Sequence, residues 1–341
     1  MPRSRRPTRS HAGEWASLLI GMMSALVIAG CVAPAITPLP KTLPSSDASS
    51  TPSTPISGAS SSREARPVAI TEVTHAIDSL LSQPVFRTAT WGVLVLGPQG
   101  DTLYAQNASK LMIPASNMKL VTAAVALAQL GPDFRFRDTA VALPLRDTVP
   151  SDFGEMYDTL FVRDHALRDV LPKLLKPSQN RLAEEIFETL ALERAGVVVR
   201  DSAAAIERRQ LAVWQVPEDG YIIHDGSGYD RANYLSAETL THLLLAMRRD
   251  TAFAVWYAAL PIAGMDGTLI RRMRATVAER HVHAKTGSLQ SIRALSGYVT
   301  TVDGTQLTFS FLCNAFTTPG QMVTDTIDRA VVLLAGLSVG S

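Results

Sequence analysis

The sequence Pro-Ala-Ser-Asn-Met-Lys occupies residues 114–119 and begins a strongly apolar segment, which predicts a helix over residues 111–129. Ser116 and Lys119 are three residues apart and therefore share one face of that helix. The backbone N–H groups at a helix start favour developing negative charge. A lysine made neutral by burial or by a second cation can take a serine proton, so Ser116 is a candidate nucleophile and Lys119 its base. The pattern alone is weak, because ordinary composition gives about one such pair in a chain of this length.

A second polar cluster, Lys-Pro-Ser-Gln-Asn at residues 176–180, precedes a helical run. Ser178 and Asn180 are two residues apart in a predicted loop, so both can face one cleft. The Ser178 hydroxyl can relay a proton to a leaving amine, and the Asn180 amide can hold a substrate carbonyl. For this cluster taken alone, helix capping by either residue is the favoured interpretation. Glu184 and Glu185, further along the helical run, are expected to face solvent.

A third cluster, Lys-Thr-Gly-Ser at residues 285–288, follows an alternating, strand-like stretch. Lys285 adds a positive charge that can lower the pKa of the Lys119 amine and attract a carboxylate. Thr286 offers a hydroxyl to the same carboxylate. A strand that simply ends in a turn is the alternative interpretation.

Two further functions are predicted for this third cluster. Gly287 has no side chain, so a substrate backbone can approach the sheet edge there and pair with it. The backbone N–H groups of Ser116 and Ser288 are candidates for an oxyanion hole.

Each of the three patterns occurs once, in the order S-x-x-K, S-x-N and K-T-G, which is typical of penicillin-binding proteins and β-lactamases. Residues 176–180, 224–228, 264–269 and 284–289 further resemble the D-alanyl-D-alanine carboxypeptidase/endopeptidase family of the penicillin-binding protein 4 type (peptidase family S13). The resemblance covers roughly residues 70–335. It implies removal of the terminal D-alanine from peptidoglycan stem peptides, cleavage of peptide cross-links, and acylation by β-lactams.

The resemblance also implies roles for individual residues. Ser116 would be the acylated nucleophile and Lys119 its base, and Ser178 and Asn180 would line the cleft. Lys285 would complete the catalytic set. The implied substrate-binding residues are Thr286, Gly287, Ser288, Asp225, Ser227 and Gly228, although a glycine-rich turn equally explains the last three.

The chain departs from the family pattern in two places. Ser178 follows Ser116 by only 62 residues, an interval in which family members usually carry large accessory domains. Residues 229–231 are Tyr-Asp-Arg where the family usually has Leu-Ser-Arg. Both differences affect the expected substrate access and the balance between carboxypeptidase and endopeptidase action.

The predicted fold is α+β, of the β-lactamase/transpeptidase type. Apolar patterning predicts an antiparallel sheet built from both chain ends, with helices on both faces and an inserted, mainly helical subdomain at about residues 131–250. The predicted strands are residues 91–96, 102–105, 294–300 and 306–312, and the predicted helical regions are residues 73–81, 155–216, 236–260 and 322–334.

The N-terminal region predicts export and anchoring. Residues 1–30 combine a basic start with an apolar stretch too short for a typical membrane span and resemble a lipoprotein signal peptide, with Cys31 as the lipidation site. An ordinary signal peptide is the alternative. Residues 31–66, rich in Ser, Pro and Thr, predict a disordered tether. A penicillin-binding/D,D-peptidase domain is expected over residues 67–341, on the periplasmic side of a bacterial membrane.

The formal net charge of +1 excludes the basic excess typical of nucleic-acid binding. No cofactor and no metal site are predicted. The expected partners are stem peptides, with β-lactams as covalent inhibitors. Two alternatives stay open: a β-lactamase on the same fold, although the E-x-x-x-N pattern of class A enzymes is absent, and a non-enzymatic, peptidoglycan-binding envelope lipoprotein.

Overall fold

The computed structural model describes residues 70–136 and 165–338, which belong to a compact unit spanning Ser62–Ser341. The predicted signal peptide, Cys31 and the predicted tether lie outside the described residues. No helix within the described ranges is long and apolar enough to cross a membrane.

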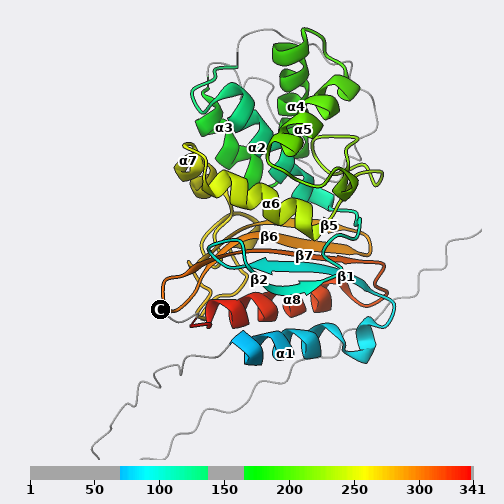
Figure 1. Ribbon diagram of the computed structural model, residues 1–341, viewed down its shortest axis with the longest axis vertical. Coiled ribbons are helices and arrows are strands. Elements are labelled where there is room, and N and C mark those ends of the chain that lie inside the picture. Colours follow the sequence, from blue (N-terminus) through cyan, green and yellow to red (C-terminus); the bar gives the residue numbers. More distant parts are fainter. Residues whose placement is uncertain (1–69, 137–164, 339–341) are drawn as a thin grey trace, which may run out of the picture. The chain divides into compact units, whose positions relative to one another are not determined.

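A five-stranded antiparallel sheet stands at the centre of this unit, in the order β2-β1-β7-β6-β5 (Figure 1). The register between β1 and β7 runs from Thr90↔Asn314 to Leu96↔Thr308, so the two ends of the chain meet in the sheet. This confirms the predicted α+β class and the origin of the sheet. The strands are β1 (Thr90–Leu96), β2 (Thr102–Gln106), β5 (Val282–Leu289), β6 (Ile292–Thr300) and β7 (Gln306–Asn314).

Helices cover both faces of the sheet. Helices α1 (Ile70–Leu81) and α8 (Gly320–Ala335) lie side by side on one face, and α6 (Ala237–Arg248) packs on the other (Figure 1). Phe309 and Phe311 of β7 belong to the hydrophobic cluster under α1 and α8, whereas Leu312 belongs to the cluster on the α6 side. Because helices cover both faces, the central strands β1, β6 and β7 are buried at almost every position.

The remaining helices form one region beyond α6. They are α2 (Met118–Leu130), α3 (Leu167–Leu175), α4 (Asn180–Ala195), α5 (Arg200–Val213) and α7 (Phe253–Ala259), with a short two-stranded sheet of β3 (Tyr221–Ile222) and β4 (Tyr234–Leu235). Helix α2 contacts α3, α4, α5 and α6. Its residues 118–127 are all buried, which explains why this helix is apolar on every side.

Two predicted helices have different limits in the structure. The helix predicted from residue 111 begins only with a 3₁₀ turn at Ala115–Asn117, because Met112 forms a β-bridge with Leu235 and Ala115 has a φ of +48°. The helix predicted over residues 236–260 is interrupted between α6 and α7. There the Asp250 side chain accepts the Ala252 backbone N–H, a local bond that competes with helix continuation. Residues 155–164 of the other predicted helical region lie outside the described residues.

Candidate active site

Ser116 and Lys119 meet at the start of α2. The 3₁₀ turn Ala115–Asn117 leaves Ser116 partly exposed, while the Lys119 side chain, one turn further on, is fully buried. Lys119 Nζ lies 2.9 Å from Ser116 Oγ, 2.7 Å from Asn180 Oδ1 and 2.7 Å from the Ser227 carbonyl oxygen. A neutral amine has two N–H groups, which can be donated to Asn180 Oδ1 and to the Ser227 carbonyl oxygen. Its lone pair is then directed to the Ser116 hydroxyl proton.

Burial sets the protonation of this amine. Desolvation lowers the pKa of Lys119 to about 7, and the carboxylates of Asp225 and Glu184 oppose that fall. The principal cause is therefore burial rather than a second cation. A base with a pKa near neutrality is suited to accept a serine proton at physiological pH.

Ser178 and Lys285 form a second hydroxyl–amine pair. Lys285 of β5 is fully buried, and its Nζ donates to Ser178 Oγ at 2.7 Å and to the Thr286 carbonyl oxygen at 3.0 Å. Burial, and then the charge of Lys119, lowers the pKa of Lys285. The helix-capping alternative does not hold, because the N-cap residue of α4 is Gln179 and no side chain caps this helix end.

Strand β5 packs closely on the turn that precedes α2. A Cβ atom on Gly287 would lie 2.6 Å from the Pro114 carbonyl oxygen and 2.8 Å from Asn117 Nδ2. Asn117 Nδ2 also donates to the Lys285 carbonyl oxygen at 3.3 Å. The structure thus gives Gly287 a packing function within the chain, whereas the approach of a substrate backbone stays a prediction. Ser288, the next residue along β5, is exposed.

Thr268, for which no role was predicted, lies beside the third cluster. Thr286 Oγ1 donates to Thr268 Oγ1 at 2.8 Å. The Thr268 N–H donates to the Lys176 carbonyl oxygen at 3.0 Å, and Lys176 Nζ pairs with Asp266 at 2.5 Å. These contacts fix residues 264–269 next to the segment that carries Ser178. The sequence signal was the Asp-Gly-Thr stretch, already noted as a family resemblance.

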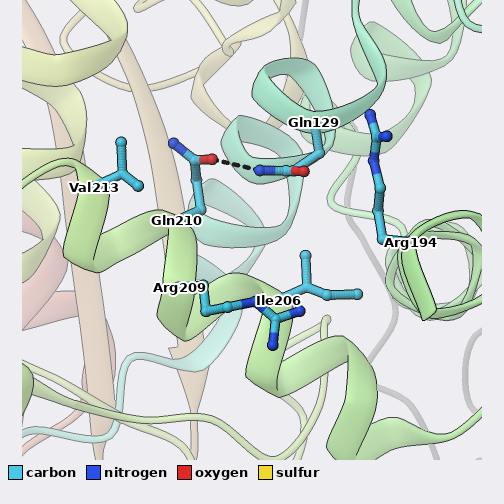
Figure 2. Close-up of a pocket in the computed structure, with 6 residues that line it drawn as sticks. All are labelled: Gln129, Arg194, Ile206, Arg209, Gln210 and Val213. Carbon is cyan, nitrogen blue, oxygen red and sulfur yellow. Dashed lines mark hydrogen bonds between the residues drawn. The ribbon is translucent and has the colours of Figure 1, made fainter.

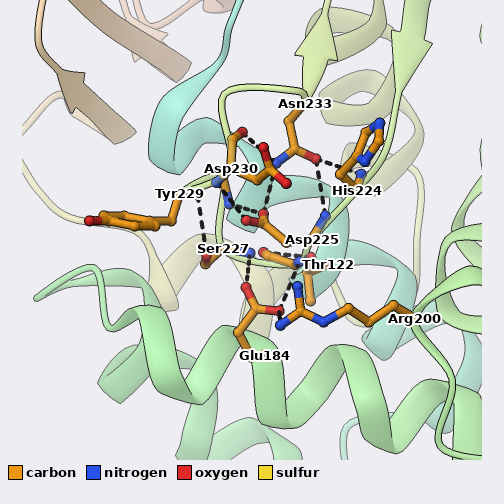
Figure 3. A network of polar contacts seen from close by, with 11 residues as sticks. Thr122, Glu184, Arg200, His224, Asp225, Ser227, Tyr229, Asp230 and Asn233 are labelled. Carbon is orange, nitrogen blue, oxygen red and sulfur yellow. Dashed lines mark hydrogen bonds and ion pairs between the residues drawn. The ribbon is translucent and has the colours of Figure 1, made fainter. Parts of the chain in front are cut away.

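Asp225 organises the loop that carries Ser227 (Figure 3), and the Ser227 carbonyl oxygen of this loop contacts Lys119. Its buried carboxylate accepts hydrogen bonds from the Gly228 N–H at 2.6 Å, the Asp230 N–H at 2.7 Å and Asn233 Nδ2 at 2.8 Å. All three bonds lie within the loop that contains Asp225. Its carboxylate therefore stabilises this loop and is not open to a ligand.

Ser227 and Gly228 are also held by packing. Ser227 is buried, and its Oγ accepts the Tyr229 N–H at 3.2 Å. Gly228 has a φ of +77°, and a Cβ atom there would lie 1.9 Å from the Ala115 carbonyl oxygen. The glycine therefore allows this loop to touch the turn that carries Ser116.

The prediction that Glu184 faces solvent is wrong. Its side chain is 19% exposed and points to the 225–233 loop, where Oε1 accepts the Ser227 N–H at 2.9 Å and Oε2 the Gly226 N–H at 3.4 Å (Figure 3). Glu185 instead pairs with Arg181 at 3.0 Å, near the surface. The signal available in the sequence was the spacing of Asn180 and Glu184, which places them on one face of a helix.

A separate hollow lies away from these residues. It has a volume of about 330 Å³ and is formed by α2, α4 and α5 (Figure 2). No residue of the three sequence patterns lines it. Its lining residues are Gln129, Arg194, Ile206, Arg209, Gln210 and Val213.

The fold and the paired serines and lysines place the chain in the structural class shared by penicillin-binding proteins and serine β-lactamases. Penicillin-binding protein 4 (dacB) from Haemophilus influenzae has a similar structure, with a TM-score of 0.64 and 15% identity over 76% of this chain and 99% of that one. The TLA-1 extended-spectrum β-lactamase gives a TM-score of 0.58 with 14% identity, over 80% of this chain and 100% of that one.

Within this class, the chain belongs to the D-Ala-D-Ala carboxypeptidase 3 (S13) family, which residues 73–145 and 159–336 match. It is 34% identical over 197 residues to a D-alanyl-D-alanine carboxypeptidase of an Actinomadura species, covering 55% of this chain and 36% of that protein. It is 28% identical over 160 residues to the D-alanyl-D-alanine carboxypeptidase DacB of Haemophilus influenzae, covering 45% of this chain and 32% of that protein. The chain thus spans about a third of the length of these relatives.

Proposed function

We propose that the chain is a serine D,D-carboxypeptidase/endopeptidase that hydrolyses D-Ala-D-Ala-type peptide bonds of peptidoglycan through an acyl-enzyme on Ser116. The observation that carries this proposal is the distance of 2.9 Å between Ser116 Oγ and Lys119 Nζ, a buried amine whose pKa is lowered to about 7. A chain that only bound peptidoglycan would gain nothing from such a pair. Family membership supports the same reaction class.

The acylation step follows from these contacts. Lys119 Nζ accepts the Ser116 hydroxyl proton while Oγ attacks the carbonyl carbon of the penultimate D-alanine. The backbone N–H groups of Ser116 and Ser288 stabilise the oxyanion. When the tetrahedral intermediate collapses, the C–N bond breaks, and the proton taken up by Lys119 passes to the leaving amine through the Ser178 hydroxyl, which Lys285 contacts at 2.7 Å. Water then attacks the ester carbonyl and gives one proton to Lys119. As the ester C–O bond breaks, Lys119 passes that proton to Ser116 Oγ and the free enzyme is restored.

The carboxylate of the terminal D-alanine would bind at the Thr286–Thr268 end of the site. The Lys285 amine, protonated when the carboxylate is bound, and the two neighbouring hydroxyls suit a carboxylate, and Asn180 would orient the peptide carbonyl. In a cross-linked substrate the leaving amine belongs to a second stem peptide, so the same steps give endopeptidase action.

The experiment that tests this function uses two readouts on the purified chain. Penicillin is expected to add once, as a stable adduct seen by intact mass, and a diacyl stem peptide ending in D-Ala-D-Ala is expected to release D-alanine. Prior treatment with penicillin should block that release. Rapid penicillin hydrolysis without an adduct would favour the β-lactamase alternative, and neither adduct nor turnover would favour the binding lipoprotein.

The envelope location is part of the proposal. Residues 1–30 would be removed as a lipoprotein signal peptide, Cys31 would carry the lipid anchor, and residues 31–66 would tether the domain over residues 67–341, with its helical insertion at about residues 131–250. The anchor supplies the membrane contact at the periplasmic side. Intact mass of the membrane-extracted chain is expected to show a lipidated Cys31 as the first residue, and an unmodified N-terminus elsewhere would contradict the anchor.

A further inference from the structure

Two helices hold the Gly226–Ser227 peptide behind the candidate base. From α2, Lys119 Nζ donates to the Ser227 carbonyl oxygen at 2.7 Å, and Thr122 Oγ1 donates to the Gly226 carbonyl oxygen at 2.8 Å. From α4, the Glu184 carboxylate accepts the N–H groups of both peptide residues (Figure 3). The carbonyls of the segment therefore face α2 and its N–H groups face α4.

Helix α4 contributes to the Lys119 environment twice. Asn180 contacts the amine directly. Glu184, four residues later on the same helical face, accepts the N–H of Ser227, the residue whose carbonyl oxygen also contacts the amine. Two of the three polar contacts of Lys119 Nζ thus depend on α4. A rotation of α4 would disturb both together.

Glu184 also acts on the amine through its charge. Its carboxylate, like that of Asp225, raises the pKa of Lys119 against the effect of burial. Burial raises the pKa of Glu184 itself, while the bonded N–H groups and Arg200, at 3.6 Å, favour its ionised form. The charged or titratable groups around Lys119 and Glu184 are Lys285 from β5, Asp225 from the 225–233 loop, Glu185 and Glu188 from α4, and Arg200 and the buried Glu207 from α5.

We propose that Glu184 is a positioning residue for Lys119: it clamps the Gly226–Ser227 peptide so that the Ser227 carbonyl faces the amine, and it places a carboxylate behind the base. This inference rests on the proposed function, because it assigns Glu184 a task in the acylation of Ser116. Asp225 cannot be tested in the same way, since its removal would release its whole loop.

The test is the pH dependence of the second-order rate constant for acylation by a fluorescent penicillin, from pH 5 to pH 9. In the wild type the rate is expected to fall below a pH of about 7, as Lys119 becomes protonated. In Glu184→Gln the missing charge should move this acidic limb lower by roughly 0.5 to 1 pH unit. Relative to each protein's plateau, the rate at pH 5.5 should therefore rise roughly three- to tenfold.

Two further variants separate charge from position. Glu184→Asp keeps the charge but withdraws the carboxylate by one methylene, so its limb should stay near that of the wild type while its plateau rate falls. Glu185→Gln removes one charge from the adjacent position, which contacts Arg181 and not the 226–227 peptide, so both limb and plateau should match the wild type. Thermal unfolding establishes that each variant is folded.

The outcomes are distinct. A Glu184→Gln limb that coincides with the wild-type limb, whatever its plateau, overturns the inference and leaves the proposed function intact. A wild type that is never acylated overturns both. Should Glu184→Gln fail to fold, Glu184→Asp carries the test: the withdrawn carboxylate should lower the plateau rate without moving the limb, and an unchanged plateau overturns the inference.

Discussion

Replacing Ser116 with alanine is expected to abolish the covalent penicillin adduct and the release of D-alanine completely. Without Oγ no ester can form, although the proposed carboxylate-binding end of the site at Thr286 and Thr268 is unchanged. The fold should be retained, because Ser116 is partly exposed and removal of its hydroxyl leaves Lys119 with two other polar contacts. Intact mass after incubation with penicillin measures the adduct, and thermal unfolding measures the stability.

The matched control is Ser109→Ala, which alters an exposed serine that precedes the same turn. This variant should form the adduct as the wild type does. An adduct on the Ser116→Ala protein would place the nucleophile elsewhere, and peptide mapping would then show whether Ser178 carries it.

Gly228→Ala is expected to damage both stability and acylation. The new Cβ would lie 1.9 Å from the Ala115 carbonyl oxygen and 2.8 Å from Met118 Cβ, at a φ of +77°. Strain in the left-handed region and overpacking together should lower the free energy of unfolding by about 3 kcal/mol. Relief of the contact would displace the turn that carries Ser116, and a misplacement of about 1 Å can reduce a rate roughly a hundredfold.

Gly304→Ala provides the comparison for this substitution. Gly304 has a φ of +84°, but nothing lies within 4 Å of an added Cβ. This variant should show only the backbone cost, about 1 kcal/mol, with normal acylation. Chemical unfolding and penicillin acylation rates distinguish the two, and equal effects at both glycines would contradict the role of the Ala115 contact.

Local sequence patterns were sufficient to predict the sheet and the contact between Ser116 and Lys119. The strands around residues 91–96 and 306–312 followed from apolar runs bounded by turn residues. The contact followed from the three-residue spacing, whereas the catalytic interpretation needed all three motifs together. These features depend on neighbours along the chain. The family resemblance then related the separate motifs to each other, which no single motif could do.

Features that depend on contacts between distant segments were missed. The start of α2 was placed too early because the positive φ of Ala115 occurs where Gly228 packs against it, and a local pattern carries no sign of that contact. Glu184 was assigned to solvent because its partners, the N–H groups of the 226–227 peptide, follow it by more than 40 residues. Thr268 was overlooked because its relation to Thr286 exists only in three dimensions.

The pairing of β1 with β7 has a consequence for how the molecule reaches its native state. Residues 90–96 pair with residues 308–314, and Asn117 contacts Lys285, which lies 168 residues further along the chain. Contacts of long sequence separation therefore hold both the sheet and the site. Such contacts carry a large loop-closure entropy and form late in folding. During synthesis the first half of the chain therefore has no complete sheet to join. The turn that carries Ser116 acquires its β5 neighbours only after residues 282–289 have emerged.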